Sequence, residues 1–149
     1  MFRTGEPVKK KVKYNYRPGI YGVIIVGNNI LVTEQNDNEI QLPGGGIDKS
    51  EHYIQALVRE TYEETGWKIQ PLKRLGFFHR FVYMPEYSKW TQKVCHIHLC
   101  KGLYNLIAPL EKGHRAILMD PCDAVNLLES PGDRIFVRNY FGLKSIINY

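Results

Sequence analysis

The residues best suited to chemistry are acidic and lie close together in the middle of the chain. Glu60, Glu63 and Glu64 lie within five residues, near the end of a predicted amphipathic helix. Like charges three and four residues apart destabilise a helix, so a compensating partner is expected. Divalent cations such as Mg²⁺ take oxygen ligands from clustered carboxylates. The segment therefore predicts a metal site that hydrolyses a phosphate compound.

The predicted helix has recognisable ends and a buried face. Asp48 and Glu51 have the spacing of a capping box, and Gly66 is placed to end the helix in the left-handed region. A buried stripe is predicted on residues Ile54, Leu57, Val58 and Thr61. At 100° per residue, the glutamates centre about 115° from that stripe. We therefore expect them along the helix edge, facing a cleft beside a sheet.

The rest of the sequence predicts strands and helices without strict alternation. Residues 20–26 are nearly all apolar, as in a strand covered on both faces, and residues 30–33 return as its hairpin partner. Further strands are expected at 40–42, 75–83 and 94–100, loops at 44–46 and 109–114, and helices at 121–129 and 133–147. This mixture predicts an α+β fold with helices packed on a mixed sheet.

Length and composition indicate one globular domain. The chain has 149 residues, of which 44% are hydrophobic and 12% aromatic. No run of 18 apolar residues and no signal-peptide pattern occurs, so we expect no membrane association. Cys95, Cys100 and Cys122 are an odd number, and the first two would point to opposite faces of one strand. A reduced, cytoplasmic protein is expected.

The net charge of +5 comes from the first 17 residues, which hold six basic side chains and one acidic one. The remaining 132 residues carry equal numbers of acids and bases, so the folded body is neutral. We therefore divide the chain into a basic N-terminal arm, residues 1–17, and a single domain, residues 18–149. The arm is expected to be a solvated tail. Alternatively, it draws a polyphosphate or a nucleic acid toward the site.

Taken together, the glycines and charges of the central segment resemble the box of the Nudix hydrolases, the pyrophosphohydrolase family that includes the MutT-like enzymes. The pattern is Gly45, five residues, Glu51, seven residues, Arg59-Glu60, two residues, Glu63-Glu64, one residue and Gly66. One apolar position departs, because Thr61 stands where an aliphatic residue is usual. The resemblance implies an αβα sandwich, with a mixed sheet between helices.

The resemblance also implies an activity and roles for the residues. The expected reaction is attack of water on phosphorus, which cleaves the diphosphate linkage of a nucleoside diphosphate derivative and requires Mg²⁺ or Mn²⁺. Glu60, Glu63 and Glu64 are expected to hold the metal, with the backbone carbonyl of Gly44. Arg59 is expected to orient a glutamate.

The acceptor of the water's proton is left open between Glu60 and a nearby carboxylate. Relatives often recruit one more acid from a later loop, frequently just after a histidine, where this chain has Arg115. Glu111, Asp120 and Glu86 are the alternatives.

Two other functions remain open. The first is a Nudix module that binds a nucleotide without cleaving it, although such a module is expected to lose box acids, and none is lost here. The second is an RNA 5′-pyrophosphohydrolase whose basic arm contacts the RNA backbone. Since no aromatic–basic RNA-binding motif is visible, a small nucleotide is the expected substrate and nucleic acid is not an expected partner. His96 and His98, on one face of a predicted strand, are expected to be a packed or solvated pair.

Overall fold

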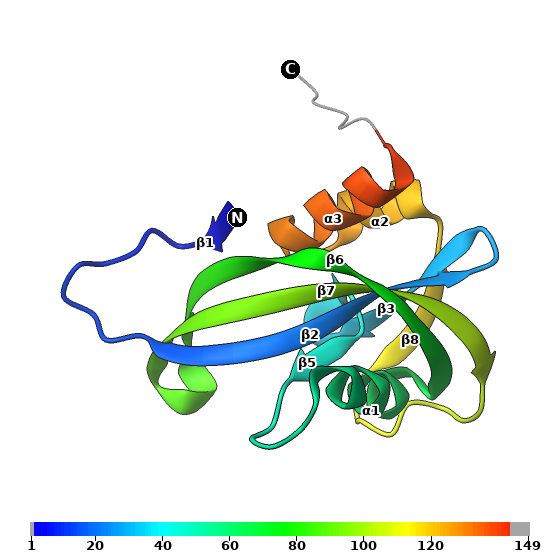
Figure 1. Ribbon diagram of the computed structural model, residues 1–149, viewed down its shortest axis with the longest axis horizontal. Coiled ribbons are helices and arrows are strands. Elements are labelled where there is room, and N and C mark those ends of the chain that lie inside the picture. Colours follow the sequence, from blue (N-terminus) through cyan, green and yellow to red (C-terminus); the bar gives the residue numbers. More distant parts are fainter. Residues whose placement is uncertain (1, 144–149) are drawn as a thin grey trace.

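A curled, mixed sheet separates one helix from two others in the computed structural model, which describes residues 2–143 (Figure 1). Helix α1 (Tyr53–Thr65) covers one face, and α2 (Pro121–Leu127) and α3 (Pro131–Phe141) cover the other. The strands are β1 (Phe2–Gly5), β2 (Asn15–Val26), β3 (Asn29–Gln35), β4 (Glu39–Gln41), β5 (Gly44–Gly46), β6 (Trp67–Met84), β7 (Lys89–Asn105) and β8 (Arg115–Met119). The α+β fold and the predicted αβα sandwich are confirmed.

Strand β2 lies at the centre of the sheet and organises it. The strand order is β1-β6-β7-β2-β3-β4, with β5 also pairing with β2 and β8 with β3. Strand β2 runs parallel to β7 and antiparallel to β3, so the predicted hairpin is present. Val23 and Ile24 are both fully buried on opposite faces of β2, because helices lie above and below it. This is why the sequence of this strand is apolar without alternation.

Each face of the sheet has its own apolar core. Beneath α1, Leu57 packs with residues such as Ile24 and Leu31. On the opposite face, Phe78 and Val137 belong to the core beneath α2 and α3. Cys95 belongs to the second core and Cys100 to the first, as predicted from strand alternation, and all three cysteines are free. No helix among residues 2–143 is both long and apolar enough to cross a membrane.

The structure corrects several boundaries. Gly44–Gly46 is a short strand paired with β2 rather than a loop, and the unforeseen strand β8 pairs with β3. The predicted helix 133–147 is α3, which begins at Pro131 and ends before the left-handed Gly142. Residues 144–147 of that prediction lie outside the described residues.

The predicted capping box at Asp48 is wrong. The helix begins five residues later, and its N-cap is His52, whose Nδ1 accepts the Ile54 N–H at 3.2 Å. Asp48 and Glu51 instead close a turn, in which the Glu51 N–H donates to the Asp48 carbonyl. The Glu51 Oε1 also accepts the Asp48 N–H at 3.3 Å, so this contact of the expected box forms in a turn outside the helix.

The N-terminal segment is not a free tail. Strand β1 pairs in parallel with residues 78–81 of β6, and β2 already begins at Asn15. The Lys9 Nζ lies 4.2 Å from the centre of the Trp90 ring. Strand β1 is thus held against the sheet, while residues 6–11 and 13 are exposed.

Candidate active site

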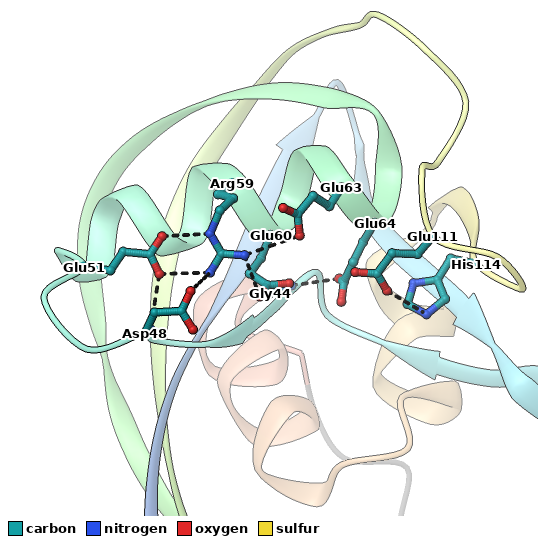
Figure 2. A network of polar contacts seen from close by, with 9 residues as sticks. All are labelled: Gly44, Asp48, Glu51, Arg59, Glu60, Glu63, Glu64, Glu111 and His114. Atoms are coloured by element: carbon teal, nitrogen blue, oxygen red, sulfur yellow. Dashed lines mark hydrogen bonds and ion pairs between the residues drawn. The ribbon is translucent and has the colours of Figure 1, made fainter.

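The acidic cluster is carried by α1, whose ends are both fixed. The left-handed Gly66 ends the helix as predicted, and its N–H donates to the Tyr62 carbonyl at 2.8 Å. Leu57 and Thr61 are fully buried against the sheet. Burial of this stripe turns Glu60 and Glu64 toward β5 (Figure 2).

Arg59 lies among four carboxylates (Figure 2). Its Nε and Nη2 donate to both oxygens of Glu51, at 2.7 and 2.9 Å. Its Nη1 donates to Glu60 at 3.1 Å and to Glu63 at 3.3 Å, and Asp48 lies 3.6 Å away. The hydrogen bonds from Arg59 lower the pKa of Glu51, and those to Glu51 raise the pKa of Arg59. One guanidinium thus offsets part of the repulsion within the cluster and orients its acids.

Gly45 leaves room for the carboxyl group of Glu60 in its present position. A Cβ atom at position 45 would lie 2.6 to 2.8 Å from the Glu60 carboxyl atoms, closer than real Cβ contacts allow. Burial raises the pKa of Glu60, although Arg59 opposes this effect. The glycine therefore makes the space that the glutamate occupies.

Glu64 is the most deeply buried acid of the box, with 7% of its surface exposed. Its Oε2 accepts the backbone N–H of Gly44 at 3.1 Å. Burial raises the pKa of Glu64 to about 8, and the nearby glutamates add to this effect. An anion in this place is stabilised by a cation beside it.

A fourth acid, Glu111, comes from the loop between β7 and β8. The N–H groups of Leu110 and Glu111 both donate to the Glu63 carbonyl, at 2.9 and 3.3 Å. The Leu106 N–H donates to the Gly66 carbonyl at 2.9 Å. The free carbonyls at the end of α1 thus hold the loop in place. As a result, Glu111 reaches the cluster from a distant part of the chain.

His114 pairs with Glu111, and its Nε2 lies 3.3 Å from the glutamate Oε2 (Figure 2). Potential ligand atoms of Glu60, Glu63 and Glu111 lie within 4.8 Å of one another, and so do those of Glu64, Glu111 and His114. The two groups share Glu111. Oxygen-rich groups of this kind suit Mg²⁺ or Mn²⁺.

The structure separates the three acids that the sequence left open. Glu111 is in the cluster. Asp120 caps α2 by accepting the Cys122 N–H at 2.8 Å, and Glu86 lies in the turn between β6 and β7. His114 was not predicted as a site residue. Its signals in the sequence are its position three residues after Glu111 and its place directly before Arg115, in the loop where relatives often carry an acid.

A cleft on the α2–α3 face adjoins the glycine strand. Two neighbouring hollows share Tyr21, Lys93 and Cys95, and one of them reaches Gly46 while the other reaches α3. Arg17 and Arg80 line its two parts. Burial lowers the pKa of Lys93. The cleft therefore offers basic groups close to the strand that contacts Glu60 and Glu64.

Comparison with known proteins shows a match to the model of the NUDIX domain over residues 15–140. An RNA pyrophosphohydrolase of Bartonella henselae is 36% identical over 70 residues, which are 44% of this chain and 40% of that protein. The chain thus aligns with less than half of this relative's length.

Solved structures share the fold across nearly the whole chain. A NUDIX hydrolase from Nitrosomonas europaea has a TM-score of 0.72 and 20% identity, covering 86% of this chain and 90% of its own. An ADP-ribose pyrophosphatase from Streptococcus suis has a TM-score of 0.64 and 16% identity, covering 87% and 94%. At this level of identity the likeness concerns the fold alone.

Proposed function

The chain belongs to the NUDIX domain family, and on that premise we propose that it is a metal-dependent pyrophosphohydrolase. The proposed reaction cleaves the diphosphate linkage of a nucleoside diphosphate derivative. The observation that carries this proposal is the convergence of the box acids and Glu111 on one small volume.

The donor set fits a hard divalent cation. Glu60, Glu63, Glu64 and Glu111 would hold it, with the Gly44 carbonyl as a further ligand. Burial raises the pKa of Glu64, and also that of Glu60 despite its contact with Arg59, so a bound cation would stabilise both anions. Such an ion, when bound, lowers the pKa of water and offsets the negative charge that grows on phosphate oxygens.

The protein residues then position the reactants and move one proton. In the proposed reaction a water oxygen forms a bond to phosphorus, the bond to the bridging oxygen breaks, and the departing phosphate takes that oxygen with its electron pair. Glu111 accepts the water's proton, since it lies at the edge of the cluster and His114 orients it. Arg59 keeps Glu51, Glu60 and Glu63 in place.

The cleft beside the glycine strand is where we place the nucleotide. Arg17 lies next to Gly46 and would bind phosphate, and Lys93 lies deeper. The end with Ser130 and Asp133 would contact the base through polar groups. Specificity then depends on a few polar contacts at that end.

A panel of nucleoside triphosphates, dinucleotides and sugar nucleotides, assayed with Mg²⁺ and Mn²⁺, tests the proposal. Glu64→Gln is expected to lower turnover by at least ~100-fold while the protein stays folded, since catalytic carboxylates contribute at this scale. Glu39→Gln, an exposed acid of β4, is the matched control and is expected to retain activity. Tight nucleotide binding without any product across the panel would instead identify a binding module.

A further inference from the structure

Aromatic rings form a continuous row along the sheet face that carries α1. Strands β6, β7 and β2 extend beyond the end of α1, which covers only part of this face (Figure 1). Ring centres follow one another at 5.2 to 6.4 Å over this extension. We call this row the ring platform, and its members in order are His96, Phe77, His79, Phe81, Tyr14, Trp90 and Tyr83.

Strand alternation explains why these rings share a face. On β7, Cys95 and Ile97 point into the core beneath α2 and α3, so His96 points the other way. His96 is paired with Phe77 across the β6–β7 ladder, and paired residues lie on one face. Among the described residues, the rings of the platform are half-buried or exposed, with no helix over them.

Three cations flank the rings. The Arg74 Cζ lies 5.1 Å from the centre of the Phe77 ring, the Arg3 Cζ 6.0 Å from that of Phe81, and the Lys9 Nζ 4.2 Å from that of Trp90. Within residues 2–143, none of the three cations forms an ion pair with an acid. The platform therefore combines flat aromatic surface with positive charge that is not neutralised.

A cavity of about 180 Å³ lies at the α1 end of the platform. Ile20 contributes apolar lining, and Tyr53, Arg74, His96 and His98 contribute polar groups. His98 is 6% exposed, and its Nδ1 has no hydrogen-bond partner among the described residues. A single aromatic ring is of the size that such a cavity holds.

We infer that the ring platform binds single-stranded RNA. Bases stack on exposed aromatic rings, and phosphates are attracted to neighbouring arginine and lysine side chains. The cavity beside His96 and His98 receives one base at the end of the row. A second copy of the chain would suit the apolar rings but not the unneutralised charge, since it would bring its own arginines and lysine to the same surface.

The assignment to RNA rests on the proposed function, because an RNA chain begun from a nucleoside triphosphate carries phosphoric anhydrides at its 5′ end. Binding itself needs no catalysis. If the platform failed to bind RNA, the hydrolase proposal would stand, and if hydrolysis failed, binding could still be measured.

The test is fluorescence anisotropy of a labelled oligouridylate of about 20 nucleotides with the full chain in EDTA. Phe81→Ala is expected to weaken binding ~10-fold or more, since stacking contributes about 1–3 kcal/mol per base. Tyr140→Ala, which removes an exposed ring on α3, is the matched control and is expected to leave binding unchanged. Hydrolysis of a small nucleotide should be unaffected by either change.

Charge is tested separately at a surface position, so the outcome does not depend on packing. Arg74→Gln is expected to reduce by about 1 the steepness of the slope of log K for RNA binding against log salt concentration. Lys101→Gln, which changes an exposed lysine of the same sheet, is expected to leave this slope unchanged. The unfolding midpoint of each variant is measured alongside.

Three results would overturn the inference. The first is equal affinity for duplex RNA, whose base faces are hidden. The second is an affinity for single-stranded DNA of the corresponding sequence that is ~10-fold higher than the affinity for the RNA. The third is the detection by light scattering of a dimer of this chain that persists when RNA is added, since a second copy would then be the occupant of the ring platform.

Discussion

Replacing Asp133 by asparagine is expected to change how stability depends on pH. Asp133 lies in the first turn of α3 with 6% of its surface exposed, and burial raises its pKa to about 7. Arg80, Lys93 and a hydrogen bond from the Leu42 backbone oppose this rise. The folded protein therefore holds the Asp133 proton at pH values where the unfolded chain has released it.

The sign follows from proton binding. Between about pH 4 and 7 the folded state binds more protons at this group, so the group's contribution to stability falls as pH rises. A pKa difference of about 3 corresponds to ~4 kcal/mol in total, of which ~2 kcal/mol is lost between about pH 5.5 and 8. The asparagine side chain of the variant has no such proton to lose. Its amide oxygen can still accept the Leu42 N–H.

Urea unfolding of both proteins at these two pH values provides the measurement. The free energy of unfolding of Asp133→Asn minus that of the parent protein is expected to be ~2 kcal/mol larger at pH 8 than at pH 5.5, because only the parent loses stability over this range. Because both proteins contain Glu64, its own titration cancels in the difference. Asp123→Asn, an exposed acid in the first turn of α2, is the control. An Asp133→Asn difference that is the same at both pH values would refute the reasoning.

Three further outcomes are expected. Gly45→Ala should weaken Mn²⁺ binding at least ~10-fold in titrations, because its Cβ displaces Glu60, whereas Gly46→Ala should not, since its Cβ would meet nothing closer than 3.8 Å. Gly66→Ala should unfold at a lower urea concentration than Gly142→Ala. Both glycines are left-handed, but only a Cβ at position 66 would clash with the loop that carries Glu111, and equal unfolding midpoints would contradict this. Removing Mn²⁺ with EDTA should abolish hydrolysis and lower stability by ~3 kcal/mol relative to a hundredfold excess over Kd, as measured by urea unfolding; activity that survives EDTA would count against metal dependence.

The box on α1 could be recognised in the sequence because its geometry is local. Residues three and four apart meet on a helix wherever the helix sits, so the spacing alone placed Glu60, Glu63 and Glu64 together. The buried stripe with Leu57 followed from the same periodicity. The N-cap could not be placed in this way, since Asp48 and His52 both lie where a capping residue could begin the helix, and the structure has His52 as the cap.

The sequence by itself determined the fold class, the box helix with its glycine end, and the apolar central strand. Tertiary structure alone decided that Glu111 joins the site and that rings from the arm, β6 and β7 line up beside the arginines of β1 and β6. These groups come from segments far apart along the chain. Their meeting depends on strand register and on how a loop hydrogen-bonds to a helix end, and a one-residue change of register would send every such side chain to the opposite face.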